Sequence, residues 1–372
     1  MTATRLNVDL HKLHHNAQTL VQRLGDRGFT VTGVTKAILG SPEIATVLLR
    51  AGVHGLADSR IENIETLRHA HISASMTLIR SPMLSQVERI VRHADVSFNT
   101  EFDVISQLSS AAQKARRTHG IVLMIELGDL REGIMPGDLE SMVRRLLRLP
   151  NIELKGIGTN LACLSGVSPD ARNMAELSRI ADSIDATFGT TLGIVSGGNS
   201  GNMQWALSDA DTMRVNNLRL GEALLLGREA LQRLPIDGLY TDAFTLTAEV
   251  IEAKIKPTLP WGDIAENAFG EIHCPRDRGH ISQLILAIGR QDVDPDGLTP
   301  PPGIEILGAS SDHLVLDAGR QHITVGDEVT FQINYSALLR AMTSPFVTME
   351  LNYQNAEYNQ PPIKETGARA PH

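Results

Sequence analysis

The chain has 372 residues, of which 42% are hydrophobic and 21% charged, and its formal net charge is -9. This length suits one large domain with a smaller one, and the acidic balance argues against a nucleic-acid partner, which needs clustered lysine and arginine. No stretch approaches the roughly 20 apolar residues of a membrane span, and no signal peptide is evident. The two cysteines, Cys163 and Cys274, cannot form a disulfide framework, so we expect a cytoplasmic protein.

Strand and helix patterns alternate over the first two thirds of the chain. A helix is predicted after each predicted strand, and the first opens at Ser41-Pro42, where Ser41 is a good N-cap. The predicted strands are Phe29–Thr35, Val53–Ala57, Met76–Ile79, Val96–Phe98, Ile121–Leu127, Ile152–Gly158, Leu192–Val195 and Met213–Leu218. Eight such units close a parallel barrel, so the pattern predicts an α/β fold, a (β/α)8 TIM barrel over residues 11–242.

The hydropathy pattern of the sequence changes after residue 242. Four apolar residues from Phe244 to Val250 alternate with polar ones, which is the period of a half-buried strand. Further short strands are predicted at Leu284–Ile288, Ile304–Leu307, Leu314–Leu316 and Val329–Ile333. We therefore expect a smaller β-rich C-terminal domain over 243–350, an N-terminal strand within residues 1–10 that pairs with it, and a disordered tail over 351–372.

Active sites of such barrels lie where the strands end. Lys36 ends the first predicted strand in apolar surroundings, which depress the pKa of a lysine and leave an amine able to form a Schiff base. A lysine that simply extends into solvent is an equally good interpretation. No metal site is predicted, because His11 and His15 share i,i+4 spacing but lack a third ligand.

Two glycine-containing turns follow the last two predicted strands. Ser196-Gly-Gly-Asn-Ser200 follows the seventh strand and Leu220-Gly-Glu222 follows the eighth. Glycine lets the backbone approach a ligand, and exposed N–H groups suit an anion. The two turns predict a phosphate site, with ordinary tight turns as the alternative.

Six motifs occur together in a fixed order. They are Val34-Thr-Lys-Ala37, Ala57-Asp-Ser-Arg60, Leu127-Gly-Asp-Leu-Arg-Glu-Gly133, Ser196-Gly-Gly-Asn-Ser200, Leu218-Arg-Leu-Gly-Glu222 and Leu307-Gly-Ala-Ser-Ser-Asp-His313. With them the chain resembles the alanine-racemase-like, fold-type III enzymes that use pyridoxal 5'-phosphate (PLP), and within these the ornithine racemase branch. The resemblance implies a homodimeric isomerase that interconverts L- and D-amino acids through an external aldimine and Cα proton exchange, with a basic substrate such as ornithine or lysine. A PLP-dependent decarboxylase of the same fold and a non-catalytic PLP-homeostasis protein are the alternatives.

The resemblance also implies roles for individual residues. Lys36 would hold PLP and exchange a proton on one face of the substrate. Arg219 would face the pyridine nitrogen, and because arginine only donates, the ring would be a weaker electron sink that favours reprotonation at Cα. Arg131 would lie near the phenolic oxygen of PLP or the substrate carboxylate. The phosphate would be held by Asn199, Ser200, Gly221, Glu222 and Tyr335.

The chain departs from the family pattern at the second base. Alanine racemases place a tyrosine on the opposite face, donated across the dimer, and our register puts Phe269 there. Phenylalanine cannot transfer a proton, so either Lys36 serves both faces or another group is needed, for which the candidates are His313, Asp312 and Cys163. We prefer His313, because histidine titrates near neutral pH, although a structural histidine and an inert buried thiol are ordinary alternatives.

Overall fold

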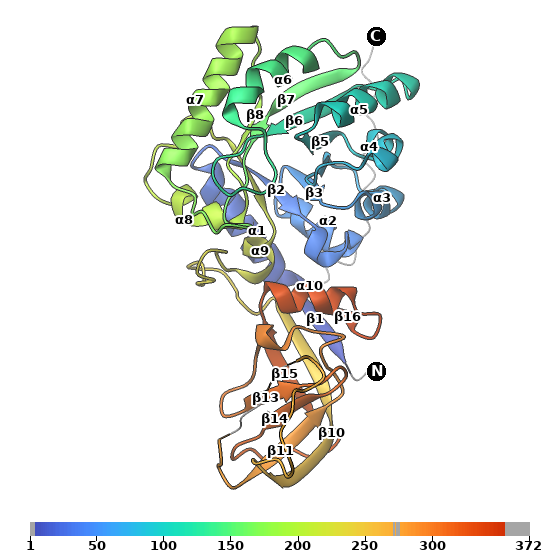
Figure 1. Ribbon diagram of the computed structural model, residues 1–372, viewed down its shortest axis with the longest axis vertical. Coiled ribbons are helices and arrows are strands. Elements are labelled where there is room, and N and C mark those ends of the chain that lie inside the picture. The colour runs from blue at the N-terminus through green and yellow to red at the C-terminus, as the bar shows by residue number, and fades with distance from the viewer. Residues whose placement is uncertain (1–3, 271, 273–275, 354–372) are drawn as a thin grey trace.

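The computed structural model describes residues 4–270, 272 and 276–353. Figure 1 shows a barrel ringed by helices at one end of the molecule and a second domain, made mainly of strands, at the other end. The predicted tail lies outside the described residues from position 354 onward. No helix in the described ranges is long and apolar enough to cross a membrane.

Eight parallel strands close into the barrel, so the predicted fold is confirmed. They are β2 (Thr30–Val34), β3 (Gly55–Asp58), β4 (Met76–Leu78), β5 (Val96–Asn99), β6 (His119–Met124), β7 (Ile152–Gly158), β8 (Ile194–Ser196) and β9 (Asn217–Leu220). The helices are α1 (Leu10–Gly25), α2 (Pro42–Arg50), α3 (Ile61–His69), α4 (Val87–His93), α5 (Phe102–Lys114), α6 (Leu139–Leu146), α7 (Ala171–Phe188), α8 (Met203–Ala206) and α9 (Glu222–Leu226).

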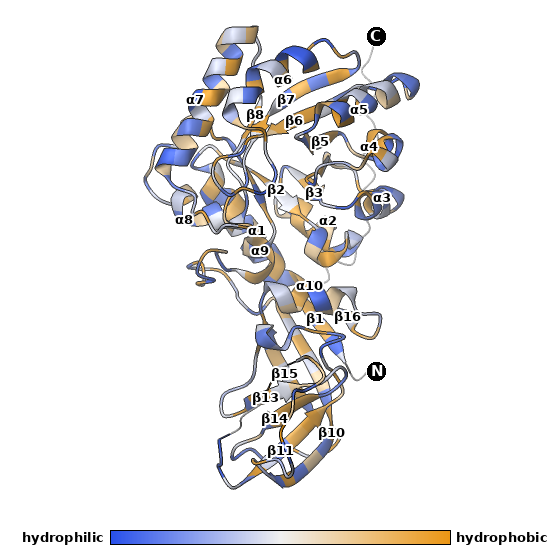
Figure 2. Ribbon diagram, viewed as in Figure 1, coloured by the Kyte–Doolittle hydropathy of each residue, from blue (hydrophilic) through white to orange (hydrophobic). Residues whose placement is uncertain are grey.

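The helices form where the sequence provides a cap and an apolar stripe. In α2, the Ser41 side chain accepts a hydrogen bond from the Ile44 N–H, and Pro42 occupies the first helical position. Ile44 and Leu48 are fully buried on the face that packs against the strands. Outer helices such as α7 therefore carry both hydrophobic and hydrophilic residues in Figure 2.

The last barrel strand was predicted in the wrong place. Met213–Leu218 was expected, whereas β9 is Asn217–Leu220, and Met213 is 47% exposed with a φ of 49°. The hydrophobic pattern misled because β9 contains a buried arginine, Arg219. Arg219 thus lies within the strand and projects into the barrel instead of following it.

The second domain is a curled antiparallel sheet, as predicted. Its central path runs β12-β15-β10-β11-β14-β13, and the N-terminal strand β1 (Arg5–Asp9) pairs antiparallel with β10 and parallel with β16. The other strands are β10 (Phe244–Pro257), β11 (His280–Leu286), β12 (Leu298–Thr299), β13 (Glu305–Ala309), β14 (Leu314–Asp317), β15 (Glu328–Ile333) and β16 (Thr348–Asn352).

One helix of the second domain was not predicted. Helix α10 (Tyr335–Thr343) begins after Asn334, whose side chain accepts a hydrogen bond from the Ala337 N–H. Ala337, Leu338 and Ala341 are buried at helical spacing. In Figure 1 this helix lies against the barrel, so the second domain forms one wall of the opening at the strand ends.

Candidate functional site

A cavity of about 790 Å³ lies between the carboxyl ends of the barrel strands and α10. Its wall includes every residue that the sequence proposed for the site except His313 and Asp312. These wall residues are Lys36, Arg131, Cys163, Asn199, Ser200, Arg219, Gly221, Glu222 and Tyr335. The cavity therefore joins residues from both domains.

Lys36 opens a short 3-10 turn, Lys36–Ile38, immediately after β2. Its Nζ lies 5.9 Å from the centre of the Tyr335 ring, so the amine and the phenol face the same space. Burial raises the pKa of the Tyr335 phenol, and the carboxyls of Glu222 and Asp58 add to this effect. The phenol is therefore a hydrogen-bond donor at neutral pH.

Asp58 anchors the segment that carries Lys36. It is fully buried at the end of β3 and accepts hydrogen bonds from the Thr35 hydroxyl at 2.7 Å, the Arg60 N–H at 2.9 Å and the Asn63 amide at 3.0 Å. Burial raises the pKa of this carboxyl, although the hydrogen bonds oppose the shift. No role was predicted for Asp58 from the sequence. The available signal was a carboxylate that directly follows the predicted strand Val53–Ala57.

One end of the cavity is formed by the turns after β8 and β9, which were predicted to bind phosphate. The Ser200 hydroxyl accepts a hydrogen bond from the Ala223 N–H at 3.1 Å, which ties the two turns together. Asn199 Oδ1 accepts from the Gly201 N–H at 2.7 Å. Burial raises the pKa of Glu222 to about 7, against the opposing charge of Arg233. This carboxyl is therefore largely protonated in weakly acidic solution.

Arg219 is buried at the floor of the cavity. Its guanidinium donates hydrogen bonds to the Ser196 hydroxyl at 2.5 Å and the Thr159 carbonyl at 2.9 Å, and it stacks 4.8 Å from the centre of the Phe98 ring. No carboxylate in the described part of the chain forms an ion pair with it. Burial lowers the pKa of Arg219 to about 10, so it keeps its proton at neutral pH.

Cys163 and Arg131 form another part of the wall. The Cys163 thiol accepts a hydrogen bond from the Asn199 amide at 3.1 Å and lies close to the Leu161 carbonyl, at 3.4 Å. Cys163 is exposed in this chain, but its thiol is partly desolvated within the cavity; this desolvation raises the pKa of the thiol, whereas the positive charge of Arg131 opposes that rise. Arg131 forms an ion pair with its neighbour Glu132. The cavity thus contains a protonated thiol and a guanidinium near Lys36.

The other candidates for the second base lie elsewhere. His313 Nδ1 lies 3.0 Å from Asp312 Oδ1, and their side chains are 44% and 62% exposed in the turn before β14. Neither lines the cavity of its own chain. Phe269 is 44% exposed, and its ring centre lies 4.9 Å from the Arg290 guanidinium.

Comparison with known proteins identifies the family to which this chain belongs. A model of the alanine racemase N-terminal domain matches residues 8–229, and the chain belongs to this family. The chain is 39% identical to an ornithine racemase from Acetoanaerobium sticklandii, over 93% of this chain and 99% of that protein. It is 37% identical to a lysine racemase from Thermotoga maritima, over 93% and 98%.

Solved structures show the same fold. An alanine racemase from D-cycloserine-producing Streptomyces lavendulae superposes with a TM-score of 0.75 at 17% identity, covering 97% of this chain and all of that one. The predicted resemblance to alanine-racemase-like proteins, and to the ornithine racemase branch, is thus confirmed.

Proposed function

We propose that this protein is a PLP-dependent amino-acid racemase that acts on a basic amino acid such as ornithine or lysine. The observation that carries the proposal is the position of Lys36, whose amine shares one cavity with two anion-binding turns and a buried guanidinium. The close relatives named ornithine racemase and lysine racemase, which match nearly the whole chain, support the choice of reaction and substrate.

The residues present fit PLP. Ser200, the N–H groups of Gly221 and Glu222, and the Tyr335 hydroxyl offer donors for a phosphate at one end of the cavity. Lys36 offers the amine for a Schiff base at the other. When bound, PLP would supply the electron sink that acidifies the Cα proton of an amino acid.

Arg219 distinguishes racemisation from the alternatives. Its pKa of about 10 keeps the guanidinium charged, so it can only donate to the pyridine nitrogen. A carboxylate at this position would instead protonate the ring and favour decarboxylation, and no carboxylate pairs with Arg219 in the described part of the chain. The second domain, which supplies Tyr335 to the cavity, argues against a PLP carrier made of a barrel alone.

Racemisation is simplest with one proton-transfer group on each face of the substrate. Lys36 would take the Cα proton on one face and return it there in the reverse reaction. We propose Cys163 for the opposite face, because its protonated thiol lines the same cavity. His313 would reach the substrate only from a second copy of the chain, as in the homodimer that the family resemblance implies. A cytoplasmic location also belongs to this proposal.

The test is a chirality screen of the common amino acids with the PLP-loaded protein. Loss of optical rotation with ornithine or lysine, together with exchange of the Cα proton for solvent deuterium, is the expected result. Borohydride should trap PLP on Lys36 in the wild type and fail in Lys36→Ala. Release of CO₂ with retained chirality would replace the proposal by decarboxylation, and absence of any trapped cofactor would reject PLP chemistry.

A further inference from the structure

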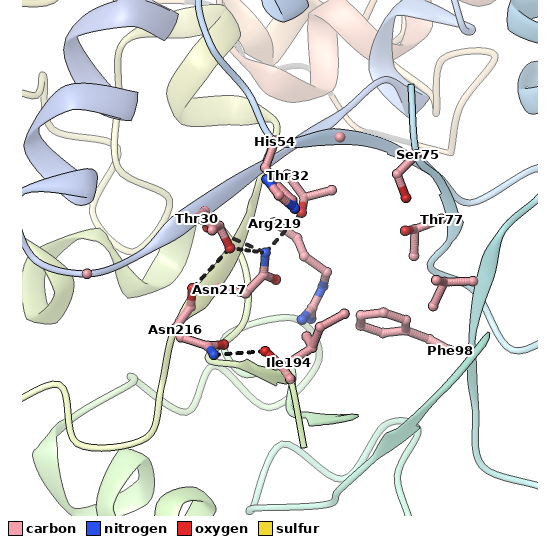
Figure 3. A pocket seen from close by; sticks show the side chains of 14 residues that line it. Thr30, Thr32, His54, Ser75, Thr77, Phe98, Ile194, Asn216, Asn217 and Arg219 are labelled. Atoms are coloured by element: carbon pink, nitrogen blue, oxygen red, sulfur yellow. Dashed lines mark hydrogen bonds between the residues drawn. The ribbon is translucent and has the colours of Figure 1, made fainter. Parts of the chain in front are cut away.

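A second cavity, of about 320 Å³, lies inside the barrel at the end opposite the candidate active site. Thr30, His54 and Ser75 lie where β2, β3 and β4 begin and form its mouth, as Figure 3 shows. Its deeper wall comes from Thr32, Thr77, Asn217 and Arg219. Arg219 also lines the active-site cavity, so this one side chain borders both spaces.

The space exists because half of the barrel interior lacks large side chains. A barrel of this type is normally filled by layers of bulky branched residues. Here an apolar cluster of Val96, Phe98, Val122 and Met124, with Ile194 packed against it, fills the side of β5, β6 and β8. Apart from Arg219, the strands β2, β3, β4 and β9 line the cavity with Gly55 and short polar residues.

The polar wall of this cavity is made of hydroxyl, amide and cationic side chains, with no carboxylate. The Asn217 amide is engaged, because it donates to the hydroxyls of Thr30 and Thr32 at 3.1 and 3.0 Å. The hydroxyls of Ser75 and Thr77 are directed toward the cavity in Figure 3, and no partner for them is found among the residues that the structure describes. No aspartate or glutamate lines the space.

Arg219 gives this wall a positive charge. Its side chain is only 4% exposed, and its hydrogen bonds go to a hydroxyl and to neutral carbonyl oxygens. A buried cation without a counter-charge is costly, and an anion close to it offsets that cost. Both cavities that Arg219 borders give an anion a route to its guanidinium.

We infer that the cavity at the amino ends of the strands binds a small oxyanion, such as a carboxylate or an inorganic phosphate or sulfate. The anion would pass the mouth formed by Thr30, His54 and Ser75, accept a hydrogen bond from Thr77 and lie on the far side of the Arg219 guanidinium. The volume is sufficient for an anion of a few atoms with ordered water. This site is separate from the phosphate turns at Ser200 and Gly221.

The experiment uses the PLP-loaded protein, so that the phosphate end of the active site is already filled. Crystals grown or soaked in sulfate and, separately, in acetate show whether a tetrahedral or a planar anion occupies the cavity. Sulfate and acetate titrations then compare Thr77→Val, which removes the hydroxyl at nearly constant volume, with Thr77→Ser, which keeps it. General salt effects act equally on both variants and cancel in the comparison.

We expect anion density beside Arg219 and a dissociation constant that rises roughly tenfold in Thr77→Val but stays within about twofold of wild type in Thr77→Ser. Binding of only one of the two probes assigns the site to that anion class. Water alone in the cavity at high concentrations of both anions overturns the inference. Equal affinities in the two variants also overturn it, because the bound anion would then lie elsewhere.

Discussion

The side-chain amide of Asn199 donates a hydrogen bond to Sγ of Cys163 over 3.1 Å. This contact links the turn after β8, which carries Ser200, to the loop after β7. Asn199 also donates to Asn160 Oδ1 and to the Leu161 carbonyl, so its amide is fixed from several sides. The thiol is therefore held in the wall of the active-site cavity, and its raised pKa keeps it protonated at neutral pH.

Replacing Cys163 should stop proton transfer on one face of the substrate and leave proton transfer on the other face. In Cys163→Ala, racemisation is expected to fall about 100-fold, because one of the two proton-transfer groups is lost. Lys36 remains, so exchange of the Cα proton for deuterium should continue from the one enantiomer whose proton faces it. Proton NMR in deuterated buffer, run separately on the L- and D-amino acid, measures this asymmetry.

The matched control is Cys163→Ser, which nearly preserves size and replaces the thiol by a hydroxyl group. Its much weaker acidity should leave racemisation between wild type and Cys163→Ala. Racemisation by Cys163→Ala at the wild-type rate would remove the thiol from the mechanism and leave Lys36 alone or a residue from a second subunit.

A substitution of His313 tests independently which residue transfers the proton on the face of the substrate opposite Lys36. Its ring is hydrogen-bonded to Asp312 and exposed within its own chain, so His313→Asn should change the racemisation rate by no more than about twofold. Steady-state rates of polarimetric change in both directions are the measurement.

Mixtures of two inactive variants test whether His313 acts across a dimer. If His313→Asn is inactive, mixing it with Lys36→Ala subunits should restore activity only when His313 acts across a dimer. The hybrid then contains one site with both an intact Lys36 and an intact His313. Restoration of activity would place His313, and not Cys163, opposite Lys36.

The sequence was a good guide where burial produces a simple pattern. The buried parallel strands appear as short apolar runs, so seven of them could be located closely, and the turn glycines marked two of the turns that line the active-site cavity. It failed where polar groups are buried. Arg219 interrupts the apolar run of β9, and hydropathy cannot indicate that a guanidinium stacks on Phe98 inside a barrel.

Tertiary contacts explain the other failures. Helix α10 packs against the turn that carries Lys36, and that contact between distant segments has no local signature beyond the Asn334 cap. Gly40 is a second example, because its φ of 65° and the 2.8 Å approach of an added Cβ to the Asn63 carbonyl oxygen mean that backbone packing requires glycine there.

Asp58 is expected to be important for stability. Asp58→Ala removes the acceptor for the buried donors of Thr35 and Asn63 and for the partly buried N–H of Arg60. We expect a loss of about 2–4 kcal/mol in the free energy of unfolding, because buried donors are left unsatisfied. Asp58→Asn keeps one acceptor oxygen and should lose about half as much. Urea unfolding at fixed protein concentration measures both, and a loss below about 0.5 kcal/mol in Asp58→Ala would contradict this role.

Glu222 should make stability depend on pH in an unusual direction. Burial raises the pKa of its carboxyl from 4.5 to about 7 in the folded protein. Between these values the unfolded chain is ionised while the folded chain keeps its proton, so stability is lost as pH rises from about 4.5 to 7. Glu222→Gln removes this titration. It should match the wild type at pH 4 and exceed it above pH 7 by about 1–2 kcal/mol, allowing for partial solvent exposure.

Chemical unfolding of the cofactor-free protein from pH 4 to 8 tests this prediction, because bound phosphate would itself shift the carboxyl. The control is Glu140→Gln on α6, whose carboxylate forms an exposed i,i+4 ion pair with Arg144 and should leave the pH profile of the wild type nearly unchanged. If the profiles of Glu222→Gln and wild type are parallel, the Glu222 carboxyl is ionised in the folded protein at pH 7. A negative charge beside Ser200 and Gly221 would then repel a phosphate, and cofactor affinity would have to increase in Glu222→Gln across the whole pH range.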